Sequence, residues 1–600
     1  MSLTVEGFEG PSAATTGPLA TTTGPPSTTT GPPSTTTGPP PAARSHAALP
    51  TSSGSASFKI PVTVPPTPSG PTTRVRSRRD PAIDLVRFAC LVVVVVLHSL
   101  MSAAVLGPDG GVVPTVALAE TTGFAVASWF FQIMPLFFII GGCAGIISWR
   151  RIRARGGSWA DYLRARLRRL VAPVTVLIGL TGLGLSAASG LGVPSELVTE
   201  ASHRIGQPLW FLAVYVGLTA LVPLAVHFHE TAPRRSLAVL TAAVIAVDGL
   251  VAATGVHGLG YVNFVLVWPL VQQLGFFYAD ALDRPVRRLH VWSGLVTALS
   301  LLVGLVAAGV YSPNMLVNLN PPTGALVLLG VVQICGLRLV HSRLTAMLTG
   351  AGGSAAEAGP ERSPDPELSP SVEHSTGAEA VPAARILRAQ FWRRLIAWGN
   401  RFGMQVYLWH MSVVIVLIGG LGWLAQAVSA VPHLAEFVLP EVGSGWWWVS
   451  RPIWLLVVMG LSAAVAMAAA WIPFPSERRL AAAGSAIARF GRELRGSSTG
   501  TRLGAAVGEG VHVAVLHPHI RAVIAVGGAT VGIAIALLAG VAPLAWTLTA
   551  IGLLMVSLMV SAGLDSCAEL LNHPTAHPLR PSSPVRGTEQ KTCGGEYDGE

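Results

Sequence analysis

Long apolar runs are the feature that most constrains how this chain of 600 residues can fold. A bilayer core of roughly 30 Å needs about 20 residues of helix, and a spanning segment must satisfy its backbone polar groups internally. The runs that reach this length lie near residues 82–106, 122–149, 169–190, 207–228, 236–255, 261–279, 290–310, 322–342, 402–428, 447–473, 520–540 and 542–563. The sequence therefore predicts an all-α, polytopic transmembrane helix bundle.

The charge content excludes a water-soluble protein. Only 12% of the residues are charged, whereas a soluble domain carries about 25%. The net charge of +10 would favour nucleic-acid binding in a soluble protein. Here the arginines gather in short loops between apolar runs, so no nucleic-acid partner is expected. The five cysteines form no CxxC or CxxH spacing, which supports neither a metal site nor a disulfide framework.

The arginines occupy alternate loops, which predicts an orientation. They precede the first run and recur between later ones, at residues 74–79, 150–155, 164–169, 234–235, 284–288, 385–394 and 478–479. The intervening loops lack Arg and Lys, with Arg204 and Arg451 as exceptions. Because positive residues stay on the cytoplasmic side, we expect a multi-pass protein of the cell membrane with both termini in the cytoplasm.

Composition divides the chain into segments. Residues 1–79 are rich in Thr, Pro and Gly and predict a disordered cytoplasmic tail. Residues 80–475 form the main transmembrane domain, which residues 350–384 interrupt as a flexible cytoplasmic insertion. Residues 476–519 are expected to be a basic amphipathic linker. A transmembrane hairpin at 520–563 and a disordered tail at 564–600 complete the prediction.

The first apolar run carries three ionisable residues on one helix face. Arg87 and His98 are eleven positions apart, which is roughly 20° from a whole number of turns and roughly 16 Å along the axis. Asp84 precedes Arg87 by three positions and can pair with it. Ionisable groups inside a span usually face a polar cavity and are functional. His98 could be a general base, or it could simply bond to a neighbouring helix while Arg87 reaches the cytoplasmic surface.

Other polar residues are weaker candidates. Arg166 and Arg169 share a helix face and could bind phosphate, although a basic loop is more often a membrane anchor. His410 lies one to two turns into its run from the cytoplasm, as a cavity wall or an interhelical hydrogen bond. Asp248 is an acid within a run that could pair with an arginine or contact substrate. Arg451 could reach water at the outer edge. No GxxxxGK[ST], HExxH or GxSxG pattern is present.

Together these motifs resemble the acyltransferase 3 family of integral membrane acyltransferases. Arg87 and His98 match its Arg, ten residues, His signature, and Arg166 with Arg169 matches its RxxRL feature. Further similarity lies in MPLFFIIGGCAG, PLWFLAVY and VYLWHMS, at 134–145, 208–215 and 406–412. NFVLVWPLVQQLGF, NPPTGALVL and WWWVSRPIW, at 263–276, 320–328 and 446–454, look like a subgroup common in actinobacteria.

The resemblance implies about ten core helices and O-acyl transfer, as in O-acetylation, from acyl-CoA to a hydroxyl of a glycan, lipid or secondary metabolite. It implies that His98 handles the hydroxyl proton and that Arg87, Arg166 and Arg169 hold the donor. Acyl-CoA would be the donor substrate, with no cofactor and no metal, and the C-terminal hairpin would be an addition to the core. The alternative is a transporter or flippase of an amphiphile, with Asp84, Arg87, His98 and Asp248 along its path. A membrane scaffold using the N-terminal repeat is a third possibility.

Overall fold

The computed structural model describes residues 80–118, 121–282, 284–349, 383–496 and 518–562. Twelve helical segments within them are long and apolar enough to cross a membrane, which confirms the all-α polytopic bundle. The predicted tails at 1–79 and 564–600 lie outside these residues, as do all but the last two positions of the 350–384 insertion.

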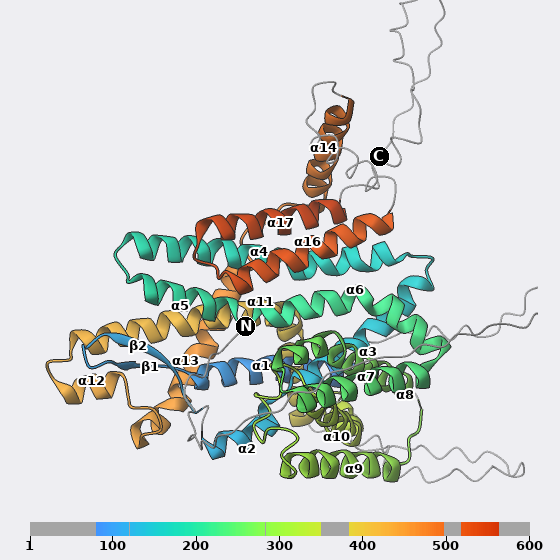
Figure 1. Ribbon diagram of the computed structural model, residues 1–600, viewed down its shortest axis with the longest axis horizontal. Helices are drawn as coiled ribbons and strands as arrows, with labels where there is room; N and C mark the ends of the chain where they lie inside the picture. The colour runs from blue at the N-terminus through green and yellow to red at the C-terminus, as the bar shows by residue number, and fades with distance from the viewer. Residues whose placement is uncertain (1–79, 119–120, 283, 350–382, 497–517, 563–600) are drawn as a thin grey trace, which may run out of the picture. The chain divides into compact units, whose positions relative to one another are not determined.

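The elements follow in chain order (Figure 1). They are α1 (Pro81–Met101), β1 (Ser102–Leu106), β2 (Val112–Val116), α2 (Thr122–Phe131), α3 (Met134–Arg153), α4 (Trp159–Gly190), α5 (Ser195–Gly206), α6 (Leu209–Thr231), α7 (Pro233–Thr254), η1 (His257–Val265), α8 (Val267–Ala281), α9 (Arg288–Ala307), α10 (Gly324–Thr349), α11 (Ala383–Ala427), α12 (Pro432–Val438), α13 (Gly445–Ala469), α14 (Glu477–Gly496), α16 (Pro518–Leu538) and α17 (Leu544–Ala562).

Helix α1 ends earlier than its apolar run. Asp80 caps its N-terminus by accepting hydrogen bonds from the backbone N–H groups of Ala82 and Ile83, which leaves fewer terminal donors unpaired. The predicted span to residue 106 is wrong at its end, because residues 102–106 form strand β1 and pair antiparallel with β2. The connecting sequence, GPDGG, favours a turn. Cross-strand hydrogen bonds then replace those of another helical turn.

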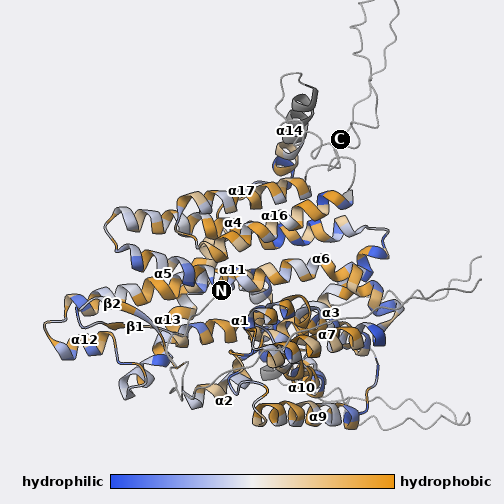
Figure 2. Cartoon of the chain, viewed as in Figure 1, coloured by the Kyte–Doolittle hydropathy of each residue, from blue (hydrophilic) through white to orange (hydrophobic). Residues whose placement is uncertain are grey.

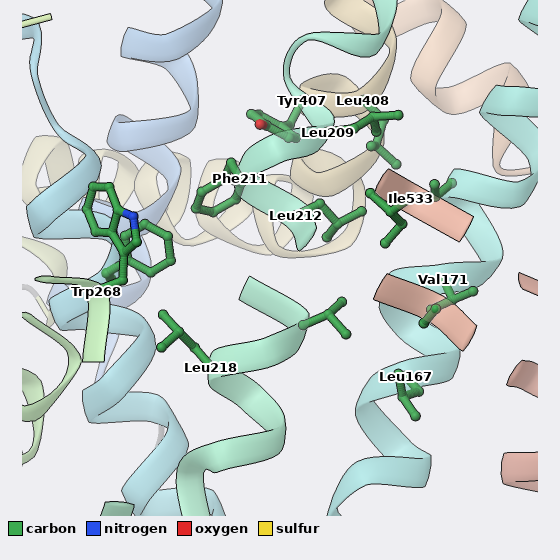
Figure 3. Packing of buried hydrophobic residues seen from close by; sticks show 14 of the residues in the cluster. Leu167, Val171, Leu209, Phe211, Leu212, Leu218, Trp268, Tyr407, Leu408 and Ile533 are labelled. Atoms are coloured by element: carbon green, nitrogen blue, oxygen red, sulfur yellow. The ribbon is translucent and has the colours of Figure 1, made fainter. Parts of the chain in front are cut away.

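Helix α6 lies in the centre of the main hydrophobic cluster. Its residues Phe211 and Leu218 pack toward Trp268 of α8, while its N-terminal turn meets Tyr407 of α11 (Figure 3). On its other side, Ile533 of α16 and residues of α4 extend the same cluster. These long-range contacts connect segments from both ends of the described chain.

Helices α3 and α8 cross at glycines. A Cβ at Gly142 would meet the backbone carbonyl of Gln272, and a Cβ at Gly275 would meet that of Ile139. In lipid, small residues at a crossing let the backbones approach closely, and packing then holds the helices together. Gly142 of the MPLFFIIGGCAG segment thus lets α3 pack closely beside α8.

The surface of the bundle is apolar along its helices. Long apolar side chains of α7 and α9 are exposed, including Val239, Ile245 and Leu289. Hydrophobic residues extend along the helices, whereas strongly hydrophilic residues concentrate near helix ends (Figure 2). An apolar surface this continuous fits contact with lipid.

The C-terminal hairpin packs on the bundle that precedes it. Helices α16 and α17 contact α6 and α4, respectively (Figure 1). The Ser202 hydroxyl accepts hydrogen bonds from the backbone N–H groups of Val541 and Ala542, which tie the hairpin turn to α5. Residues 477–496 of the predicted linker form α14, whose first residue, Glu477, bonds to α4. The domain boundaries themselves stay predictions.

Candidate active site

Helix α1 carries three of the predicted site residues. It is unbroken from Pro81 to Met101, so Arg87 and His98 are roughly 16 Å apart along one face, as expected. An Arg87 Nη atom donates to a carboxylate oxygen of Asp84 at 3.4 Å. The side chain of Arg87 is 30% exposed. The cation is therefore accessible near the arginine-rich end of the helix, while His98 lies near the opposite end.

His98 pairs with a second histidine from a distant part of the chain. Its Nδ1 lies 2.8 Å from Nε2 of His410 on α11, and the two rings are nearly parallel at 9°. His410 is 0% exposed, and it lies on the 45-residue helix that starts at Ala383. His410 was predicted one to two turns into its apolar run; α11 begins well before that run, and His410 lies opposite His98.

The pair has only one consistent arrangement of protons when both rings are neutral. Nδ1 of His410 contacts the carbonyl oxygen of Tyr407, which can only accept, so this nitrogen carries the hydrogen. Nε2 of His410 must then accept from Nδ1–H of His98. Nε2 of His98 is left with a lone pair and has no hydrogen-bond partner among the described residues. His98 is only part-buried, so this lone pair is accessible.

Neighbouring contacts hold the two histidine-bearing helices. The hydroxyl of Tyr407 donates to the carbonyl of Pro208 at 2.7 Å, which joins α11 to the start of α6. Trp454 of α13 donates its indole N–H to the Ser99 carbonyl at 2.9 Å. Leu91 and Phe88 of α1 meet Gly403 and Gly399 of α11, where side chains would clash. The His98–His410 geometry therefore depends on three helices packed closely together.

Helix α11 also has buried polar atoms without partners near His410. The Gln405 side-chain carbonyl, the Trp409 indole N–H and the Ser412 hydroxyl have no hydrogen bond to other described residues. Leaving such a group unsatisfied costs about 1–3 kcal/mol. These atoms lie within two helical turns of α11, on a face of the helix different from the one that carries His410.

The arginines at the start of α4 divide into two sets. Arg164 and Arg168 both bond to the carboxylate of Glu477 on α14. Arg166 instead lies over the Tyr162 ring at 4.3 Å, and no carboxylate of the described chain pairs with it. Arg169 donates to the backbone carbonyl of Asn400 on α11 at 3.3 Å. Arg166 and Arg169, the pair predicted to bind phosphate, thus make contacts other than the ion pairs of Arg164 and Arg168 with Glu477.

Helix α11 brings the α4 arginines toward α1. Arg169 contacts the carbonyl of Asn400, and the preceding residue, Gly399, lies against the ring of Phe88. Phe88 follows Arg87 directly. One turn of α11 therefore contacts both Arg169 of α4 and Phe88, the residue next to Arg87, at the arginine-rich end of the bundle.

Asp248 has structural partners rather than an arginine. Its carboxylate accepts hydrogen bonds from Asn263, Tyr311 and the backbone N–H of Gly324 at the start of α10, at 2.7, 2.8 and 2.8 Å. Burial and the bond to Asp248 raise the pKa of Tyr311, so the phenol stays a neutral donor. The predicted pairing with arginine is not what the structure shows, because three local donors occupy this acid.

Sequence reasoning missed two polar networks at the arginine-rich end. Arg150 and Arg153 of α3 form ion pairs with Glu230, and Arg150 also reaches Asp280, which His229 contacts at 3.0 Å. Glu230 and Asp280 are close in sequence to arginines, and a count of net charge does not show that such acids form ion pairs with other helices.

The second network joins α1 to α10. Asp80 lies 3.0 Å from His341, which also contacts the hydroxyl of Tyr278. Burial raises the pKa of Asp80, but hydrogen bonds from His341 and from the backbone have a larger, opposite effect. The pKa of Asp80 is therefore below its ordinary value. Asp80 is therefore ionised at neutral pH and helps to fix the start of α1.

Comparison with known families identifies the class of protein. The family model described as an acyltransferase domain, acyltransferase 3, matches residues 80–355. This stretch belongs to the acyltransferase 3 family. The chain is therefore a membrane acyltransferase, which is an enzyme. No curated protein and no solved structure matches it.

The matched stretch of the acyltransferase holds α1 to α10 and thus Arg87, His98, Arg166 and Arg169. His410 and Arg451 lie beyond it, on α11 and α13. Both later helices pack against α1. The structure thus completes the surroundings of His98 with helices that follow the family match.

Proposed function

We propose that this acyltransferase moves an acyl group from acyl-CoA to a hydroxyl of a sugar, glycan, lipid or secondary metabolite, with His98 as the general base. The observation that carries the proposal is the His98–His410 pair. Its hydrogen bonds leave the Nε2 lone pair of His98 without a partner. A neutral imidazole with an accessible lone pair accepts a hydroxyl proton near neutral pH.

The reaction then follows from this geometry. Nε2 of His98 takes the proton of the acceptor hydroxyl while its oxygen attacks the thioester carbon. The new C–O bond replaces the C–S bond, and the coenzyme A thiolate leaves. His98 returns its proton to that sulfur. Between these steps the imidazolium is stabilised by Nε2 of His410, which accepts from the opposite edge of the ring.

The donor phosphates fit the arginine-rich end of the bundle. Arg87, Arg166 and Arg169 all lie at this end, Arg169 in contact with α11, and arginine binds phosphate through paired hydrogen bonds. Arg87 is roughly 16 Å from His98 along α1. An extended pantetheine arm could therefore join phosphates bound near Arg87 to a thioester beside His98. Under this proposal the arginine-rich ends, and both termini, face the cytoplasm, where acyl-CoA is found.

Transfer of label tests the proposal against a transporter. The purified chain in liposomes receives acyl-CoA labelled in its acyl group, with extracts of the host's glycans and lipids as acceptors. We expect covalent label on an acceptor and release of free coenzyme A. Movement of an amphiphile across the bilayer without any acylated product would instead support the transporter.

Replacing Arg87 by alanine is expected to weaken donor binding. A hydrogen bond to a charged group contributes about 1.5–3 kcal/mol, so KM for acyl-CoA should rise about 10- to 100-fold with a smaller change in kcat. Acyl-pantetheine, which lacks the nucleotide phosphates, should be used equally well by both forms. Steady-state kinetics with the two donors measures this difference.

The exposed Arg234 provides the control, since Arg234→Ala removes a cation from the same end of the bundle. It should leave both KM values unchanged. An unaltered KM for acyl-CoA in Arg87→Ala would remove Arg87 from the donor site.

A further inference from the structure

Arg451 is a part-buried cation near the start of α13, at the end of the bundle opposite the arginine-rich loops. Its Nε donates to the Trp447 carbonyl at 3.1 Å, and one Nη donates to the Ser450 hydroxyl at 3.3 Å. A guanidinium carries more N–H donors than these two bonds use. Within the described part of the chain, Arg204 at this end pairs with Glu200, whereas Arg451 has no carboxylate partner.

Two indole rings fix the orientation of this guanidinium. Its central carbon is 4.5 Å from the centre of the Trp447 ring and 5.5 Å from that of Trp454. Trp447 is 1% exposed and packs against Ala103 and Ala117 beside the β1–β2 hairpin. Stacking on aromatic faces leaves the edge of a guanidinium available for hydrogen bonds in its plane.

The same indole connects Arg451 to the catalytic helix. Trp454 donates to the carbonyl of Ser99, the residue that follows His98. Trp454 also shares an apolar cluster with Val95 of α1 and Val414 of α11, about one turn from His98 and from His410. Arg451 therefore lies one indole ring away from the helix that presents the base.

The charge at this position lacks compensation. The bond to the Trp447 carbonyl holds the guanidinium beside the first turn of α13, where the helix macrodipole is also positive. An anion placed there would be attracted by both. Phosphate and carboxylate oxygens match the fork of an arginine.

We propose that Arg451 binds an anionic oxygen group, such as a phosphate, on the acceptor and thereby positions the acceptor hydroxyl at His98. The positioning of the hydroxyl rests on the proposed function, whereas the binding of the anionic group by Arg451 does not. The acceptor class is then an anionic glycan or glycolipid that enters from the end opposite the donor.

Binding is tested on the full chain in a neutral detergent without acyl-CoA. The probes are glucose 1-phosphate and the uncharged methyl glucoside, and the readout is the melting temperature. Ligand binding at 10 to 100 times Kd stabilises the folded state enough for a rise of about 1–2 °C in a chain of this length. We expect this rise with glucose 1-phosphate only. It should be lost in Arg451→Gln, reduced in Arg451→Lys and retained in Arg204→Gln, whose arginine already has Glu200.

A second arm separates an acceptor from a lipid headgroup. Micelles containing phosphatidylglycerol replace those containing phosphatidylcholine. An Arg451-dependent rise with phosphatidylglycerol, without one for glucose 1-phosphate, would mean that the residue binds the headgroup of a surrounding lipid and would overturn the proposal. An equal rise with glucose 1-phosphate in Arg451→Gln would overturn it as well. Because no donor is present, failure here is distinct from failure of the labelled transfer.

Discussion

Substituting alanine for His98 is expected to abolish acyl transfer to within the background rate. General base catalysis contributes about 10²–10⁴-fold, and the Nε2 lone pair of His98 has no substitute in the histidine pair, because His410 uses its own Nε2 to hold His98. The loss should fall on kcat, with KM for acyl-CoA nearly unchanged, since the arginines proposed to bind the donor lie at the end of the bundle away from His98. Initial rates of labelled transfer measure both constants.

A matched control removes a histidine that has no place in the reaction. His227 is an exposed residue of α6, and His227→Ala should keep the wild-type rate. Both variants should insert and purify as the wild type does, since His98 contributes one interhelical hydrogen bond within a large apolar cluster. Full transfer activity in His98→Ala would exclude His98 as the base.

Helical periodicity in the sequence was enough to place Asp84, Arg87 and His98 on one face of α1, but it could not identify the partner of His98 on another helix. The spacing of Arg87 and His98 follows from helix geometry, and so does the Asp84–Arg87 pair that the structure contains. His410 is 312 positions from His98, and a single sequence offers no rule for which helices meet. The start of α11 was also not predicted, because the helix begins at Ala383, before the apolar run.

Two further differences have local causes. The run that includes Ser102–Leu106 has the composition of a helix, yet those residues pair with Val112–Val116 in a hairpin. Hydropathy alone does not distinguish an apolar strand from the last turn of a span. Conversely, Arg166 and Arg169 were correctly placed on one helix face. Glu477 could not be assigned to Arg164 and Arg168, because the contact depends on the packing of α14.

Loss of His410 is the sharper test of the proton arrangement. In His410→Ala, Nδ1–H of His98 loses its acceptor, so either nitrogen can carry the hydrogen and the ring can rotate. Part of the population then presents N–H instead of a lone pair to the hydroxyl, and the imidazolium formed during transfer loses its stabilising bond. We expect kcat to fall about 10- to 100-fold, the equivalent of a charged hydrogen bond of roughly 1.5–3 kcal/mol, with both KM values nearly constant.

The conservative variant separates positioning from packing. A glutamine at 410 can offer its side-chain oxygen near the place of Nε2, so His410→Gln should recover much of the rate that alanine loses. Val414→Ala removes buried side-chain volume one turn further along α11, which should lower the melting temperature comparably while leaving kcat within about threefold, since it changes only packing. Equal kcat losses in the alanine and glutamine variants, or a matching loss in Val414→Ala, would mean that His410 supports the packing of α11 and does not set the tautomer of His98.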